Sequence, residues 1–253
     1  MSGSAALVFL TTIIAVGQPH TSAFDVGSIR LSPPGEGGRD WGPQSIEATP
    51  GGLAIRNMRL ADTIRWAYNV QPYQVVAPSW TNDVRFDISA KAASAAPESE
   101  LRLMLQSLLA DRFKLALHQE IRELPVLLLT VNKNGHKLQQ TTTEGTPSFK
   151  TGKMNLTGAG ASISQLTEFL SREVQTPVVD RTGLTGKYNF FLDIGSFVTD
   201  EIRRNMPRDG PPLEAPGIIS QAMQEQLGLK LNSSKAPITV LVIDQVEKVP
   251  TEN

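Results

Sequence analysis

Hydrophobic and polar positions along this chain follow the periods of helices and strands in turn. The clearest helical pattern is the stripe of Leu101, Met104, Leu105, Leu108 and Leu109. Its spacing of three and four residues places one side of a helix against a core. The sequence therefore predicts a core-facing helix that begins just after residue 97.

Strand patterns surround this helix. Val84, Phe86 and Ile88 alternate with polar residues, which predicts a strand with one face in water. Residues 113–117 alternate in the same way, and residues 126–131 are typical of a separate, buried strand. A further helix is expected near Leu60, with Asn57 as its N-cap.

The second part of the chain repeats this order. Residues 219–231 and 236–244 resemble residues 100–117 and 124–131, and Pro237 falls where Pro125 stands. Ser162 and Gln165 form a capping box that opens another helix. We therefore predict an α+β fold of two tandem, related β-α-β-β-α-β-β units with small, mostly antiparallel or mixed sheets.

The predicted boundaries follow from changes in composition. The first unit covers residues 18–138 with a lead-in rich in Pro and Gly, and the polar stretch 139–152 is the expected linker. The second unit covers residues 153–248 and contains an inserted loop at 195–216. Residues 249–253 form a tail.

The first 17 residues have the pattern of a signal peptide. Residues 5–16 are apolar but too few to span a bilayer, and Ala15 and Gly17 suit a cleavage site. No Lys or Arg precedes them, so the true start could lie upstream, and a buried N-terminal helix or strand is the alternative. We expect an exported bacterial protein, periplasmic or extracellular, without a transmembrane span after cleavage.

Composition narrows the function. The chain has 253 residues, 40% of them hydrophobic, and 24 Lys and Arg against 25 Asp and Glu give a net charge of −1. This balance argues against a nucleic-acid binder. The absence of cysteine excludes disulfides and thiol catalysis. The three histidines have no ligand spacing, so we expect neither a metal nor a cofactor.

No catalytic motif is present, and the candidate residues each have a structural alternative. His118 with Glu120 could form an acid–base pair or be surface polar residues. Asp180, Arg181 and Lys187 could line a polar site, or Asp180 could accept the N–H groups of its own turn.

The aromatic residues Trp66, Tyr73 and Trp80 are the other binding candidates. They could form an exposed binding patch. The alternative is a helix face and a loop that pack on the core.

Residues 101–117, 120–126 and 180–190 resemble an uncharacterised family of exported, soil-associated bacterial proteins known as a domain of unknown function. The resemblance covers most of residues 24–248. That family's domain also occurs joined to membrane peptidases of the β-lactam-sensor type, which implies a sensing or recognition role. More loosely, the chain is similar to the small N-terminal domains of secretins and TonB-dependent receptors, which bind protein partners.

These observations favour an exported, non-enzymatic module that recognises a protein or peptide by a sheet edge or a groove. An envelope hydrolase with an unrecognised site is one alternative. A small-ligand sensor that binds between the two predicted units is another.

Overall fold

The computed structural model describes residues 23–33, 42–142, 145–152, 154–198 and 216–251. Contacts divide the chain into two compact units. Unit 1 comprises Met1–Val70, Ala77–His118 and Leu241–Asn253, and unit 2 comprises Gln71–Val76 and Gln119–Val240. The chain therefore passes between the units several times.

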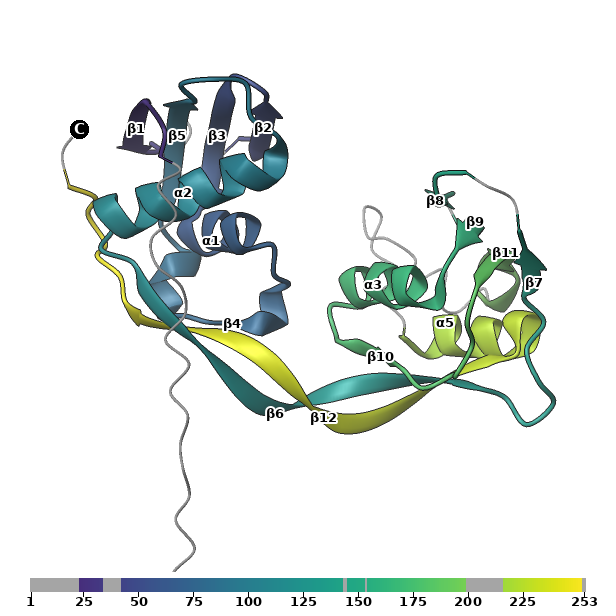
Figure 1. Ribbon diagram of the computed structural model, residues 1–253. Coiled ribbons are helices and arrows are strands. Elements are labelled where there is room, and N and C mark those ends of the chain that lie inside the picture. Colours follow the sequence, from purple (N-terminus) through teal and green to yellow (C-terminus); the bar gives the residue numbers. More distant parts are fainter. Residues whose placement is uncertain (1–22, 34–41, 143–144, 153, 199–215, 252–253) are drawn as a thin grey trace, which may run out of the picture. The chain divides into compact units, whose positions relative to one another are not determined.

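Unit 1 is built on a four-stranded antiparallel sheet in the order β1-β5-β3-β2. Its strands are β1 (Val26–Leu31), β2 (Ser45–Thr49), β3 (Gly52–Arg59) and β5 (Arg85–Lys91). The helices α1 (Leu60–Tyr68) and α2 (Glu98–Arg112) lie on the same face of this sheet (Figure 1). We call the opposite face of this sheet the outer face.

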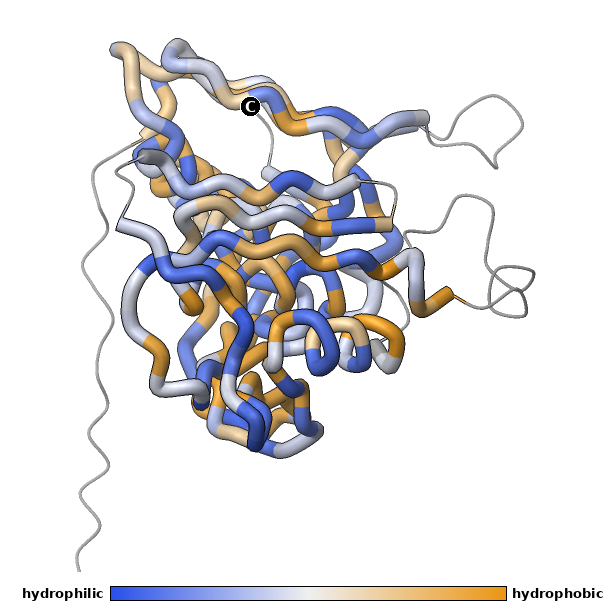
Figure 2. Tube along the Cα trace, turned by 90° about the vertical axis from the view of Figure 1, so that its right-hand side faces the viewer, coloured by the Kyte–Doolittle hydropathy of each residue, from blue (hydrophilic) through white to orange (hydrophobic). Residues whose placement is uncertain are grey.

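Alternation along the strands explains this arrangement. Phe86, Ile88 and Ala90 of β5 are buried, whereas Ser89 and Lys91 are exposed. The same alternation of hydrophobic and hydrophilic positions can be followed along the strands in Figure 2. A period of two places one set of side chains under the helices and the other on the outer face. The prediction of a strand with one wet face is confirmed.

The core of unit 1 joins the sheet to α2. The helix buries Leu101, Met104, Leu105 and Leu109, and Phe113 follows it into the core. The rings of Phe86 and Phe113 meet edge to face, with centroids 4.9 Å apart. The stripe in the sequence therefore has the role predicted for it.

Unit 2 contains a second four-stranded antiparallel sheet in the order β7-β11-β9-β8. Its strands are β7 (Gln139–Thr141), β8 (Ser148–Thr151), β9 (Asn155–Ala161) and β11 (Lys187–Asp193). The helices α3 (Ile163–Glu173) and α5 (Pro216–Ala222), with a π-helical turn at Met223–Leu227, pack into the same hydrophobic core. That core includes Leu156, Leu166, Phe190, Leu192, Ile219 and Met223.

A third sheet has the order β10-β6-β12-β4. It contains the long strands β6 (Ala116–Val131) and β12 (Leu229–Gln245) and the short strands β4 (Val75–Val76) and β10 (Val178–Asp180). β10 runs parallel to β6. Contacts of His118 with Asp244 and of Thr130 with Asn232 show that β6 and β12 run antiparallel.

The elements of the first half (β1 to β6) and the second half (β7 to β12) correspond in order. Each half has three strands, a helix, two strands, a second helix and a long final strand. The strand orders β1-β5-β3-β2 and β7-β11-β9-β8 also correspond. In the third sheet, β4 of the first half pairs with β12 of the second, and β10 of the second half pairs with β6 of the first.

Equivalent irregularities interrupt the two main sheets. A β-bulge separates the pairs Ile55–Ile88 and Met58–Phe86, and another separates Phe190–Gly158 from Tyr188–Ala161. In each bulge one residue has positive φ, Asn57 at 52° and Gly160 at 59°. The backbone N–H of Asn57 donates a hydrogen bond to the side chain of Asp87 on the neighbouring strand, and that of Gly160 donates to the side chain of Asn189 in the same way.

The α+β fold class and the capping box of Ser162 and Gln165 are confirmed. Other local predictions differ from the structure. Asn57 does not cap a helix, because α1 begins at Leu60 and Asn57 lies in the bulge. The strand expected at 113–117 is wrong for Phe113–Leu115, because Phe113 caps the end of α2 and Lys114 has positive φ. Residues 116 and 117 belong to β6, which continues without a break through the strand expected at 126–131, because backbone pairing with β12 requires no apolar pattern.

The polar stretch 139–152, expected as a linker, contains β7 and β8 and falls within unit 2. These strands gain hydrogen bonds from β11 and β9, which composition alone does not reveal. The predicted signal peptide at 1–17 and residues 199–215 of the predicted inserted loop lie outside the described residues. Within the described ranges, no helix is both long and apolar enough to cross a bilayer.

Candidate functional site

Trp66 lies on α1 in unit 1 and is half-buried against Ala96, Leu101 and Met104. The guanidinium of Arg102 stacks 4.3 Å above the Trp66 ring and donates a hydrogen bond to the Trp66 carbonyl oxygen. This contact joins α1 to α2 and uses one face of the indole. Trp66 therefore has a packing role in the structure.

The other two aromatic candidates are also partly buried. Trp80 lies in the 3₁₀ turn η2 (Ser79–Asn82) of unit 1, which packs against α1. Tyr73 lies in the 3₁₀ turn η1 (Pro72–Gln74), which belongs to unit 2. Burial raises the pKa of the Tyr73 hydroxyl, and a hydrogen bond with Ser171 on α3 acts in the opposite direction. The three aromatic candidates are thus divided between the two units.

Asp180 ends β10 and stabilises the turn that follows it. Its Oδ1 accepts hydrogen bonds from the backbone N–H and the hydroxyl of Thr182, both at 2.8 Å. Arg181 and Lys187 have exposed side chains, and the backbone N–H of Arg181 donates to the Leu129 carbonyl. The carboxylate of Asp180 is therefore engaged in local turn structure.

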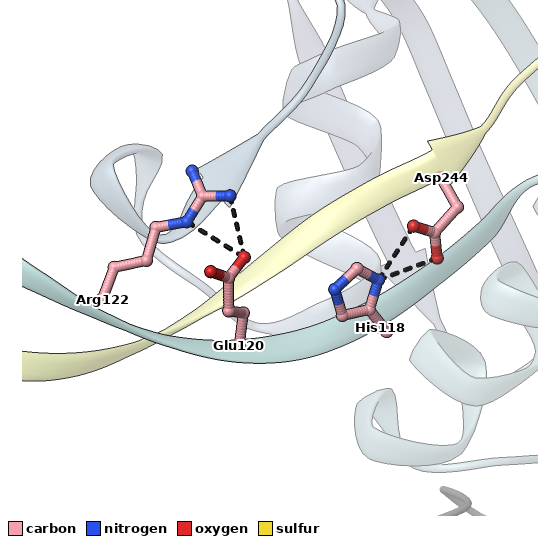
Figure 3. Close-up of polar contacts among 4 residues, drawn as sticks. All are labelled: His118, Glu120, Arg122 and Asp244. Atoms are coloured by element: carbon pink, nitrogen blue, oxygen red, sulfur yellow. Dashed lines mark hydrogen bonds and ion pairs between the residues drawn. The ribbon is translucent and has the colours of Figure 1, made fainter. Parts of the chain in front are cut away.

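His118 is paired with Asp244 across β6 and β12 (Figure 3). Its Nδ1 lies 2.8 and 2.9 Å from the two carboxylate oxygens of Asp244. Glu120 Oε2 accepts hydrogen bonds from Nε and Nη2 of Arg122 on the same strand, at 3.1 and 2.8 Å. The partner of the imidazole is thus Asp244, a residue that sequence spacing could not bring to it.

No group of three or more His, Cys, Asp or Glu side chains that could hold a metal ion occurs among the described residues. Gly158 and Gly160 of β9 have structural roles. A Cβ at Gly158 would lie 2.3 Å from the Phe190 ring, and Gly160 supplies the positive φ of the bulge. Both glycines are needed by the sheet itself.

The outer face of the unit 1 sheet contains a hollow of about 440 Å³. It is open to solvent and is lined by Ser28, Arg30, Ala54, Ile55, Arg56, Asp87, Ile88 and Ser89. We call this feature the outer-face hollow. The lining includes none of the residues that the sequence suggested as binding candidates.

Small side chains create the outer-face hollow. Ser28 and Ala54 lie on either side of Ser89, since β1 and β3 both pair with β5 at this level. One residue further along, Arg30 lies opposite Asp87, and Arg56 lies in the bulge on the other side of Asp87. The guanidinium groups of Arg30 and Arg56 are exposed and border a floor of hydroxyl and methyl groups.

Asp87 is held in place by buried donors. Its Oδ1 accepts hydrogen bonds from the backbone N–H of Asn57 at 2.7 Å and from the Ser32 hydroxyl at 2.8 Å. Ser32 and Asn57 are 3% and 8% exposed, so water is a poor substitute acceptor for them. This carboxylate therefore has a structural role in the bulge besides its place in the outer-face hollow.

The outer face is locally cationic although the whole chain has a net charge of −1. Its strands place Arg30, Arg56, Arg59, Arg85 and Lys91 on this face, where the carboxylates are Glu47 and Asp87. Partial burial, and then the charge of Arg59, lowers the pKa of the Arg85 guanidinium. The same two causes lower the pKa of Arg65. Like charges thus lie close enough together to repel one another.

The equivalent face in unit 2 has a different character. At the positions that correspond to Arg85, Asp87 and Ser89 it carries Lys187, Asn189 and Phe191. The Phe191 side chain is 56% exposed. The equivalent surface thus carries a large aromatic group where unit 1 has a hollow.

Sequence reasoning placed Arg85, Asp87 and Ser89 on a wet strand face, but it did not identify a site there. The missing information was strand order. Ser28, Ala54 and Ser89 are far apart in the sequence and become neighbours only because β5 lies between β1 and β3. The only available signal was the pairing of small with cationic residues along each strand.

The fold is α+β, and the outer face of the unit 1 sheet carries an open, polar hollow. A family model described as a protein of unknown function (DUF3738) matches residues 61–246. The chain therefore belongs to this family, as the resemblance to a domain of unknown function led us to expect. No curated protein and no solved structure matches the chain.

The matched range begins at the start of α1. It includes Asp87 and Ser89 of the outer-face hollow, whereas Ser28, Arg30, Ala54 and Arg56 precede it.

Proposed function

We propose that the protein is an exported, non-enzymatic recognition module that binds a protein or peptide partner through the outer face of unit 1. The outer-face hollow carries this proposal. It offers exposed arginines and serines on a sheet that a well-packed core holds rigid. Polar groups preset on a rigid scaffold suit recognition, because little conformational entropy is lost on binding.

Export is the second part of the proposal. Its support is the apolar run at residues 5–16 and the small residues Ala15 and Gly17. The resemblance to domains joined to membrane peptidases of the β-lactam-sensor type favours a role in sensing or recognition outside the cytoplasm. Fractionation of cells that express the full chain, or a version without residues 1–17, tests this part. Equal retention of both proteins in the cytoplasm would contradict export.

We further propose that the two halves are copies of one ancestral unit. The support is the corresponding order of elements and strands, together with the equivalent bulges at Asn57 and Gly160. Two further pairs of positive-φ residues occupy equivalent places, Asn69 with Gln175 after the first helix and Lys114 with Gly228 before the long strand. Such strained positions seldom coincide without a shared backbone.

The experiment is site-specific photo-crosslinking with benzoylphenylalanine in place of Ala54, in the middle of the outer-face hollow. The matched control places the same group at Thr157, which pairs with Phe191 as Ala54 pairs with Ser89. We expect a discrete adduct with an envelope protein or peptide from position 54 and none from position 157. Equal labelling from both positions, or none from either, would contradict recognition through this face.

An envelope hydrolase is the second candidate function. The observation that favours it is the His118–Asp244 pair, because a carboxylate at Nδ1 orients an imidazole for proton transfer. The two side chains are 52% and 48% exposed, so the pair lies in water rather than in an enclosed site. Ester or peptide hydrolysis that is lost in His118→Ala and retained in Arg122→Ala would establish this function instead.

A small-ligand sensor is the remaining alternative. A thermal-shift screen against cell-wall fragments and metabolites tests it, because a ligand that binds the native state raises the unfolding temperature. A neutral ligand that stabilises the protein equally in the wild type and in an Arg56 variant would favour this alternative over recognition through the outer-face hollow.

A further inference from the structure

We infer that the outer-face hollow is an acidic-peptide site, in which Arg30 and Arg56 bind two carboxylates of one extended segment. The inference rests on the proposed recognition function and specifies the chemistry of the partner. Both arginines are exposed, and they occupy the two strands that flank β5. Guanidinium groups bind carboxylates in a planar, two-point geometry that a lysine cannot match.

The spacing of the two arginines suits a peptide. β1 and β3 are separated by β5, so Arg30 and Arg56 start about 10 Å apart, which is two strand spacings. In the extended polyproline II conformation a chain rises about 3.1 Å per residue with three residues per turn, so acidic residues three positions apart point to the same side and span about the same distance. A Glu-x-x-Glu segment that crosses the strands can therefore reach both guanidinium groups.

The floor of the outer-face hollow complements such a segment. Ser28 and Ser89 contribute hydroxyl groups, and Ala54 leaves the space above it open. The volume of about 440 Å³ falls within the range of about 300–1,000 Å³ that is usual for ligand sites. The hydroxyls can donate hydrogen bonds to a carboxylate or to the peptide backbone between two acidic residues.

The surrounding charges favour an anionic partner. Arg59 and Arg85 add positive charge beside the outer-face hollow, and the Arg59 charge contributes to the lowered pKa of Arg85. An anion relieves that mutual repulsion when it binds. The carboxylate of Asp87 opposes this effect, and hydrogen bonds from Asn57 and Ser32 hold its Oδ1 in place.

A peptide fits this surface better than a nucleic acid does. Among the described residues that line the outer-face hollow, none has an aromatic side chain on which a base could stack, and stacking platforms are the usual feature of single-strand binders. Glu47 and Asp87 lie among the cations and would repel a continuous phosphate backbone. Separate carboxylates can avoid both of them.

The test uses fluorescence anisotropy of the full chain with two labelled peptides, Gly-Ser-Glu-Gly-Ser-Glu-Gly-Ser and the same peptide with Gln for each Glu. We expect binding of the Glu peptide that weakens as salt increases, and little binding of the Gln peptide. Arg30→Gln and Arg56→Gln should each weaken binding about tenfold, equivalent to about 1.4 kcal/mol. Arg172→Gln, an exposed arginine on α3 in unit 2, is the matched control and should leave affinity unchanged.

Asp87→Asn determines the sign of the partner's charge. It should strengthen binding of the Glu peptide, because it removes a negative charge and keeps the oxygen that Asn57 requires, as Asn189 does for Gly160. Weaker binding in Asp87→Asn would overturn the inference and indicate a cationic group in the outer-face hollow. Thermal unfolding of each variant verifies that the fold is retained.

The outcomes separate this inference from the proposed function. If crosslinking at position 54 captures a partner but the Glu peptide does not bind, the acidic-peptide site is wrong and the recognition function stands. If an oligonucleotide binds more tightly than the peptide and the same arginine variants abolish its binding, a nucleic acid replaces the peptide as the ligand. Peptide affinity that the two arginine substitutions leave unchanged would also overturn the inference.

Discussion

Replacement of Asp87 tests the physical account of the bulge in unit 1. Asp87→Ala removes the acceptor of two buried donors, the backbone N–H of Asn57 and the Ser32 hydroxyl. A buried donor left without a partner costs about 1–3 kcal/mol, so the loss of the acceptor for both donors should lower the free energy of unfolding by about 2–6 kcal/mol. Asp87→Asn keeps an oxygen acceptor and loses only its charge, so it should cost about 1 kcal/mol.

The assay is urea unfolding followed by tryptophan fluorescence. Trp66 and Trp80 lie in unit 1, so their emission reports the unit that contains Asp87. The midpoint should fall in the order wild type, Asp87→Asn, Asp87→Ala, with little change in the slope of free energy against urea.

Unit 2 supplies a matched test of the same reasoning. Asn189→Ala should cost about 1–3 kcal/mol, because the backbone N–H of Gly160 loses its acceptor. Asn189→Asp keeps an oxygen at this position and should be tolerated. If Asp87→Ala lies within about 0.5 kcal/mol of wild type, or if Asp87→Asn is equally damaging, the proposed role of this side chain is refuted.

Three further substitutions test other parts of the fold. Gly228→Ala should lower the free energy of unfolding in urea by more than about 2 kcal/mol, because φ of Gly228 is 65° and the new Cβ would lie 2.3 Å from the Gly135 carbonyl oxygen. The control is Gly145→Ala, which has open space around its Cβ position and should change the free energy of unfolding by less than about 0.5 kcal/mol. Ser162→Ala removes the side-chain cap of α3 and should cost about 1 kcal/mol, and equal melting temperatures of variant and wild type would contradict this. Burial raises the pKa of Tyr68 above its ordinary value of 10.0, so its contribution to stability is present below that pH and is lost as the pH rises through the folded-state pKa. The free energy of unfolding should therefore fall less steeply with rising alkaline pH in Tyr68→Phe than in the wild type. Identical pH profiles of the two proteins would show that Tyr68 does not cause the alkaline loss of stability.

Local sequence patterns were reliable for α2 and β5, each of which has one side facing a core. The stripe from Leu101 to Leu109 predicted α2, and the alternation of Phe86 and Ile88 predicted β5 and its wet face. These predictions succeed because burial against a single core imposes the period of the element on its sequence. The capping box at Ser162 succeeded for a similar reason, since the N–H groups that it satisfies lie within the next turn.

Predictions failed where a segment is stabilised by backbone pairing instead of apolar contact. The middle of β6 and most of β7 are exposed, so their sequences lack a strong alternation of apolar and polar residues and resemble loops. Asn57 illustrates a second failure, because its polar side chain suggested a helix cap. The structure uses its tolerance of positive φ in a bulge instead.

The sequence by itself determined the α+β class, the positions of the buried helices and the polar face of β5, because each of these depends on neighbours a few residues away. Only the tertiary structure decided the strand order β1-β5-β3-β2, and with it the outer-face hollow between Arg30 and Arg56. Strand order depends on pairing between segments that are distant in the chain, and backbone hydrogen bonds are nearly the same for every residue type. The amino-acid sequence therefore gives little indication of which strands become neighbours, although the proposed binding surface is formed by neighbouring strands.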